Sequence, residues 1–218
     1  MTIASFKDKQ DDLVINPGNL AVIAAKYGTT VPTKLGAPGG GLIALPVGWE
    51  PLGEVAKKDG AKITPDVKTA EIEGYGSPTP RRVLRTAESV TVSFTAQEAR
   101  RVNVEMFWNA ELGSTVADAD GEWQIKKSAA DGLLNNYYSI ILVGQDTNTA
   151  GLVFPYYIFP KVSVTKTDAQ SFDMEAELAY PLTFTAYEDP VFGGYMAHGS
   201  AGAGQAAVNT LAGFSAGS

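Results

Sequence analysis

The sequence predicts a β-rich domain of the α+β class with a single long helix. The 218 residues include 23 glycines and 12 prolines, which mark frequent turns between short extended segments. Residues 88–95 and 173–187 alternate apolar with polar side chains, as strands do when one face packs on a core. A hydrophobic content of 44% is sufficient for such a core in a chain of this length.

Residues 1–41 are expected to form an irregular N-terminal arm. A short helix over residues 20–27 is expected to end at Gly28, and the Pro-Gly-Gly-Gly run at 38–41 breaks regular structure. The first residues include no apolar segment of the signal-peptide kind. No run in the chain approaches the ~18 apolar residues of a membrane helix, so we expect no membrane contact.

The main β domain is expected over residues 42–189. Its expected strands cover residues 42–45, 67–73, 88–95, 122–126, 137–143, 152–164 and 173–187. Residues 74–85 are expected to form a long loop, because two prolines remove ladder donors. Fixing about 12 such residues costs on the order of 12–24 kcal/mol of backbone entropy, so the loop is either mobile in the monomer or docked on a neighbour. We expect docking through Tyr75, Pro78, Pro80, Arg81 and Arg82.

One α-helix is expected over residues 95–112. Thr95 and Glu98 have the spacing of a capping box, and Gly113 stands where a helix commonly ends. The helix has two apolar stripes, and the second consists of Val104, Trp108 and Leu112. Because a helix with two apolar faces is covered twice, the second cover is either an arm of the same chain or a neighbouring subunit. We predict a subunit interface at these three residues.

The segment 173–187 carries apolar or aromatic side chains at seven consecutive even positions, which predicts a strand. Its polar face begins with Asp173, Glu175 and Glu177. Three interpretations are open for these carboxylates: an acid pair of a glycosidase, a solvated face, or a functional acidic surface.

Catalysis, metal binding and cofactors are not expected. The chain has no cysteine, which excludes disulfides, thiolate chemistry and cysteine-based zinc sites. His198, the single histidine, lies in the segment 190–218, which is expected to be a flexible Gly/Ala-rich tail. Asp118, Asp120 and Glu122 suggest a plain turn more than a calcium loop. The net charge of −7 argues against a nucleic-acid-binding protein, because such proteins carry clustered Lys and Arg side chains that neutralise phosphates.

The order of elements between residues 40 and 190 resembles the major tail tube proteins of long non-contractile-tailed (siphovirus) bacteriophages, in the form common among phages of actinobacteria. The resemblance rests on the segments Gly48–Val55, Glu71–Gly76 and Arg81–Arg85, and on a strand at Ser89–Thr95 that leads directly into a helix. It implies a β-sandwich or barrel with one flanking helix.

The resemblance also implies that the chain is a non-enzymatic virion protein, assembled in the host cytoplasm, whose hexameric rings stack into the tail tube. The tape-measure protein and the tail terminator and tip proteins are the implied partners, and the genome passes through the tube without specific binding. A negative wall would repel DNA over about 8 Å at physiological salt, so we expect Asp173, Glu175 and Glu177 to face the lumen. Alternatives are another β-rich virion component, such as a tail terminator or head decoration protein, and an enzyme or sugar-binding module.

Overall fold

The computed structural model describes residues 3–58, 60–76, 78–112, 117–129, 131–175 and 177–215. Within these residues, eight strands form one antiparallel sheet with the order β2-β1-β5-β6-β7-β4-β3, and β8 also pairs with β6. The strands are β1 (Asn19–Lys26), β2 (Glu50–Pro51), β3 (Lys62–Ile72), β4 (Arg82–Ala96), β5 (Tyr137–Asn148), β6 (Gly151–Thr167), β7 (Tyr180–Ala186) and β8 (Ala197–Ala201). The helices are α1 (Ile3–Lys7), α2 (Arg101–Trp108) and α3 (Ala203–Val208), with 3-10 turns at Asp11–Leu13 and Asp131–Leu133. The predicted β-rich class with a flanking helix is confirmed.

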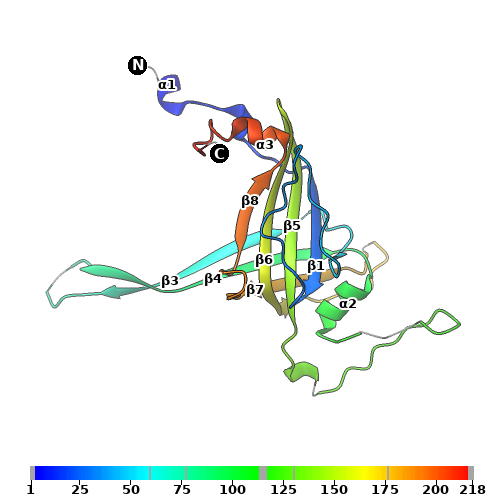
Figure 1. Ribbon diagram of the computed structural model, residues 1–218. Helices are drawn as coiled ribbons and strands as arrows, with labels where there is room; N and C mark the ends of the chain where they lie inside the picture. Colours follow the sequence, from blue (N-terminus) through cyan, green and yellow to red (C-terminus); the bar gives the residue numbers. More distant parts are fainter. Residues whose placement is uncertain are drawn as a thin grey trace.

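The sheet folds across itself at β6, so that its two parts enclose the core. The first part of β6 pairs with β5 and β8, and its last part pairs with β7. As a result β3, β4 and β7 run across β1 and β5 (Figure 1). One buried cluster joins both parts, and Phe94 stacks on Phe184 with ring centroids 5.5 Å apart. The sandwich-like arrangement follows from the alternation in β4 and β7, in which every second side chain from Val90 and from Tyr180 is buried.

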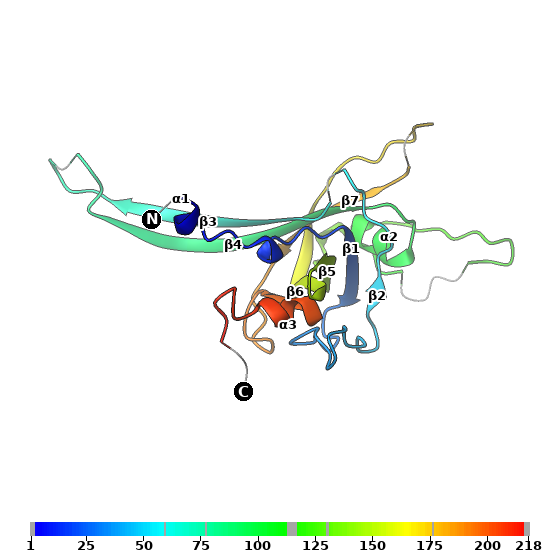
Figure 2. The ribbon, with the colours of Figure 1, turned by 90° about the horizontal axis from the view of Figure 1, so that it is seen from above.

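The antiparallel pair β3–β4 extends far beyond this core. Lys62 of β3 pairs with Ser93 near the body, and Ile72 pairs with Arg82 at the far end. Beyond Val67 the residues of β3 are exposed on both faces. The hairpin projects from one side of the molecule, whereas the α2–β5 and β6–β7 connections project from the opposite side (Figure 2). Of the loop expected over residues 74–85, residues 82–85 belong to the ladder of β4, and residues 73–81 separate the two strands.

The helix expected over residues 20–27 is wrong, because this segment forms β1. It pairs with β5 at every position from Asn19↔Gln145 to Lys26↔Tyr138. Val22 and Ala24 enter the core between the two parts of the sheet. The high helix propensity of its three alanines is overridden by tertiary pairing, as commonly happens for short segments. The N-terminal region thus supplies an interior strand of the sheet.

The strand expected over residues 173–187 begins only at Tyr180. Residues 171–175 and 177–179 are not in strand, and Ala176 lies outside the described residues. Alternation predicts a strand only where partners exist on both sides, and the partners of β7 end at Ala96 of β4 and Thr167 of β6. The strand expected over residues 122–126 is also absent, since this part of the α2–β5 connection has no ladder partner.

The helix expected over residues 95–112 covers only Arg101–Trp108. Thr95 remains in β4, so the predicted capping box does not form, and Arg100 is the first residue before the helix. Asn109 ends the helix in the left-handed conformation, with φ of 48°. Asparagine tolerates this conformation better than most residues. Gly113, expected to end the helix, lies outside the described residues.

The C-terminal segment expected to be a flexible tail contains two ordered elements. β8 pairs with β6 from Phe154↔Ala201 to Ile158↔Ala197, and α3 follows it across the end of the sheet (Figure 1). Small residues permit this close contact. A Cβ on Gly202 would lie 2.2 Å from the carbonyl oxygen of Leu152, and one on Gly199 would lie 2.5 Å from the hydroxyl of Tyr156.

Candidate functional site

The distal part of the β3–β4 hairpin, residues 67–87, is called the hairpin arm below, and its described residues are exposed except for Gly74 and Leu84, which are half-buried. All five residues predicted to dock on a neighbour lie at its tip and are exposed: Tyr75, Pro78, Pro80, Arg81 and Arg82. Tyr75 is fully exposed, and the apolar side chains of Ile72 and Val83 are about half exposed. Among the described residues, neither Arg81 nor Arg82 has an ion-pair partner. The arm thus carries apolar and cationic groups that its own chain leaves uncovered.

A register shift marks the point where the arm leaves the body. Lys68 pairs with Ala87, but the next residue, Thr69, pairs with Arg85, so Thr86 is an extra residue in β4. Such a bulge bends and twists its strand. Just below it, the hydroxyl of Tyr195 donates a 3.1 Å hydrogen bond to Glu88, and this contact raises the pKa of Tyr195. The root of the arm is therefore fixed, and its direction is set by the bulge.

The structure separates the three residues of the predicted helix interface. Val104 and Leu112 are buried in a cluster with Ala96 and Tyr180, against which Ile125 of the α2–β5 connection packs. This stripe therefore packs against β4, β7 and the α2–β5 connection of the same chain. Trp108 differs, because its side chain is 47% exposed and contacts the Phe107 ring edge-on at 5.2 Å. Of the three, Trp108 alone offers surface to a second copy.

A buried polar network holds α2 against the segment that follows β2. The amide of Asn103, fully buried, donates to the carbonyls of Leu52 and Glu98, both at 2.8 Å. Glu98 accepts from the backbone N–H of Glu54 at 2.9 Å and from Arg100 at 2.6 Å. These two hydrogen bonds, the backbone one first, lower the pKa of the Glu98 carboxyl. The helix is thereby locked to the sheet edge.

The three carboxylates predicted to face a lumen lie in the β6–β7 connection, residues 168–179, called the acidic loop below. Asp173 accepts from the backbone N–H of Glu175 at 3.1 Å. Glu177 accepts from the amide of Gln97 at 2.8 Å, which lowers its pKa. The lumen prediction was argued from the polar face of a strand, and these residues are outside β7. That argument no longer supports it, and the prediction stays untested.

The acidic loop also carries apolar side chains, and two of them, Met174 and Leu178, were expected on the core face of a strand. Phe172 is 95% exposed, Met174 is fully exposed and Leu178 is 37% exposed. Their alternation with the carboxylates was visible in the sequence. What the sequence did not show is that the described part of the chain leaves Phe172 and Met174 uncovered.

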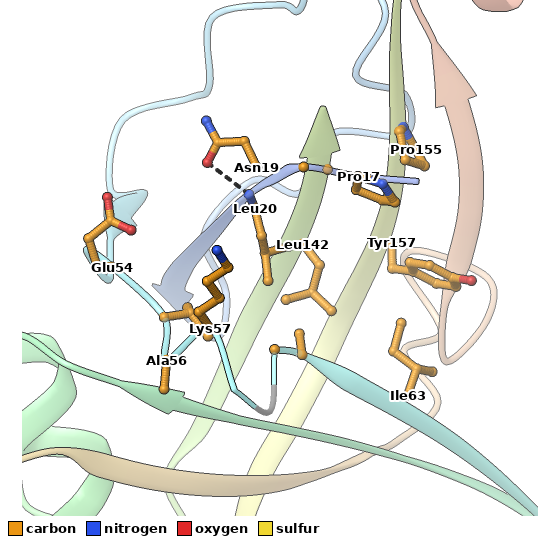
Figure 3. Close-up of a pocket in the computed structure, with 15 residues that line it drawn as sticks. Pro17, Asn19, Leu20, Glu54, Ala56, Lys57, Ile63, Leu142, Pro155 and Tyr157 are labelled. Carbon is orange, nitrogen blue, oxygen red and sulfur yellow. Dashed lines mark hydrogen bonds between the residues drawn. The ribbon is translucent and has the colours of Figure 1, made fainter. Parts of the chain in front are cut away.

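An open cavity of about 520 Å³ lies between β1, β5 and β6 and the β2–β3 connection (Figure 3). Its walls are mostly apolar, and Leu20, Leu142 and Tyr157 line it with Ile63. Glu54 and Lys57 are the charged residues in its lining, and they stand at its margin. Apart from these two residues, the described lining includes no Asp, Glu, His, Ser or Thr side chain.

Within the described ranges, no group of three or more His, Asp or Glu side chains is arranged to hold a metal ion. Asp118 accepts the backbone N–H groups of Asp120 and Glu122, the geometry of a plain turn. His198 is on β8, where its ring stacks on Tyr157 at 4.1 Å and contacts the carbonyl of Tyr156. It is therefore an exposed residue of an ordered strand, with its ring stacked on Tyr157.

None of the helices among the described residues has the length and apolar character required to cross a membrane.

Comparison with known proteins gives a family match and distant structural likenesses. The sequence model of the phage tail tube protein family matches residues 8–192. No curated protein sequence matches the chain. Among solved structures, the chain is similar to a crystal structure of an Hcp protein with a TM-score of 0.32 and 10% identity, over 84% of this chain and 98% of that one. A likeness at that score bears on neither fold nor function.

Proposed function

The chain belongs to the phage tail tube protein family, and from this premise we propose that its copies form rings that stack into the tube through which the phage genome is delivered. The chain is a structural component of the virion tail. We propose six copies per ring, assembled in the host cytoplasm, and we assign no catalytic step to the protein.

The hairpin arm is the observation that carries this proposal. An isolated two-stranded ribbon is at best marginally stable in water, because it lacks a third strand or a packed face. Here the arm is exposed on both faces beyond Val67 and yet presents Ile72, Val83 and Tyr75 to solvent. A second copy of the chain would cover these side chains and would supply the packed face that the ribbon lacks in the isolated chain. Trp108, on the opposite side from the arm, is a further apolar contact for a neighbouring copy.

The remaining partners follow from the role of a tube. A hollow tube of fixed length needs an internal ruler during assembly and closing proteins at its two ends. We therefore propose contacts with a tape-measure protein in the lumen and with tail terminator and tip proteins at the ends. The genome would pass without specific binding, in keeping with the net charge of −7.

Electron microscopy of the purified protein tests the proposal. We expect concentration-dependent growth of hollow tubes with a regular axial repeat, and rotational averaging of end views gives the number of copies per ring. A tail terminator or head decoration protein would instead stop at single rings or bind to capsids. Protein that stays monomeric at high concentration would contradict the proposed function.

A further inference from the structure

The hairpin arm and the acidic loop carry opposite charge. Between residues 68 and 85 the arm has four basic and two acidic side chains, which leaves a net charge of +2 in a protein whose total is −7. The acidic loop has four acidic side chains and no basic ones. Of these four, Asp168 is already paired with Lys166 at 2.7 Å, which leaves Asp173, Glu175 and Glu177 without an ion-pair partner among the described residues.

In the isolated chain, both surfaces also expose apolar side chains. The loop presents Phe172 and Met174, each at least 95% exposed, and the arm presents Tyr75 and Val83. Monomeric soluble proteins seldom leave such groups together without a partner for them. Each surface therefore combines apolar contacts with charges of one sign, and the two signs are complementary.

The two surfaces lie on opposite sides of the molecule. In both ribbon views the hairpin projects away from the body on one side and the acidic loop projects on the other, so they cannot meet within one chain (Figures 1 and 2). Contact between two unlike surfaces of identical copies is head-to-tail, and it repeats without limit unless rotation closes it. When each copy makes this contact with the next, the copies form a growing stack.

We propose that the hairpin arm of one copy docks on the acidic loop of a copy in the next ring, with Arg81 and Arg82 facing Asp173 and Glu175 and with Tyr75 and Val83 packing near Phe172 and Met174. This inference rests on the proposed function and names the surface that receives the arm. It gives Asp173 and Glu175 a role in assembly, in place of the lumen wall predicted for them.

Docking also accounts for a segment whose sequence alternates like a strand. Residues 172–178 alternate apolar and acidic side chains, yet the described residues among them, 172–175 and 177–178, are in no strand. A second copy supplies the missing partner, because an added strand brings main-chain hydrogen bonds and covers alternate side chains. The segment then extends β7 toward its N-terminal side.

Charge reversal tests the contact. The variants Arg81→Glu/Arg82→Glu and Asp173→Lys/Glu175→Lys should each raise the concentration needed for tube growth by at least about tenfold, because like charges would meet. The variant that combines all four substitutions should recover growth, because the charges are again complementary. Lys34→Glu/Lys58→Glu, a reversal at exposed sites away from both surfaces, is the matched control and should assemble normally.

The outcomes separate this contact from the proposed function. Growth of wild-type tubes tests the function, whereas the reversals test the contact. If either double variant grows tubes normally, or if the combined variant fails to recover while its monomer melts like the wild type, the contact is wrong. Tubes of Asp173→Lys/Glu175→Lys that grow normally but retain duplex DNA would place these residues on the lumen wall.

The apolar part of the contact has its own test. Phe172→Ser/Met174→Ser should also raise the concentration needed for growth, with no change in monomer melting, because both side chains are solvated before docking. Unchanged growth of this variant would contradict the packing against the arm.

Discussion

The hydroxyl of Thr86 donates a 3.1 Å hydrogen bond to the backbone carbonyl of Lys68, across the hairpin at the position where the β3–β4 register shifts. Thr86 is the extra residue of the bulge, and it lies between the anchored and the exposed parts of β4. The direction in which the arm leaves the body therefore depends on one residue.

Deletion of Thr86 should redirect the arm without unfolding the domain. Without the extra residue the ladder becomes regular, and the bend and added twist of the bulge are lost. We expect a melting temperature close to that of the wild type and loss of tube growth. The matched control Thr86→Ser keeps the bulge and should assemble. Normal tubes from the deletion variant would show that the direction of the arm is unimportant.

Replacement of residues 74–82 by a Gly-Ser loop should also stop tube growth. This removes Tyr75, Pro78, Pro80, Arg81 and Arg82 while the core beneath β4 is untouched. Circular dichroism should show the wild-type fold, because none of these side chains is buried. Sedimentation measures assembly, and normal tubes from this variant would remove the tip from the interface.

Trp108 and Leu112 should respond differently to substitution by alanine. Leu112 is 5% exposed and packs in the cluster with Tyr180, so Leu112→Ala should cost roughly 2–5 kcal/mol of unfolding free energy. Trp108 is half exposed, and Trp108→Ala should cost roughly 1 kcal/mol while it weakens assembly. Urea unfolding and tube yield separate the two effects. If Trp108→Ala lowers the unfolding free energy as much as it lowers the tube yield, the role of Trp108 lies within the chain.

The Glu98 carboxyl should make stability depend on acid pH. Its pKa is lowered below the ordinary value of 4.5, so the native state holds the charged form to lower pH than the unfolded chain does. Its contribution is present above pH 4.5 and is lost as pH falls through the lower native pKa. In Glu98→Gln the difference from wild type should therefore be largest at neutral pH and shrink in acid. If the difference in unfolding free energy between Glu98→Gln and wild type is the same at neutral and acid pH, this carboxyl is not the cause of the pH dependence.

The sequence predicted strands well where both faces have partners within the chain. Alternation at Val90, Val92 and Phe94 predicted β4, and the apolar run at 137–143 predicted β5, because each of these segments is packed inside the sheet. The same alternation at Met174 and Leu178 gave a wrong start to the strand predicted over residues 173–187, because period 2 shows that the two faces differ and does not show that a neighbouring strand exists. Pairing decides that, and pairing here involves residues far apart in sequence.

Local propensity failed where distant contacts decide the structure. Residues 20–27 were expected to be helical, but β5 pairs with them from more than a hundred residues away. β8 was hidden in a Gly/Ala-rich segment for a related reason: Gly199 and Gly202 look like flexible residues, yet they allow close approach to Tyr156 and Leu152. At the candidate site, the five residues predicted to dock are exposed at the tip of the arm, and their docking stays a prediction. The burial of Val104 and Leu112 involves Ile125 of the α2–β5 connection, which lies far from them in the sequence.

Hydrogen–deuterium exchange of the backbone amides in β3 and β4 tests the central claim most directly. The claim is that the arm, residues 67–87, is covered only when copies assemble. In the monomer we expect its amides to exchange much faster than those of residues 90–96 at the core, and in tubes we expect both parts to be protected. Equal exchange of the arm in monomer and tube would show that no second copy covers it, and the account of assembly would be wrong.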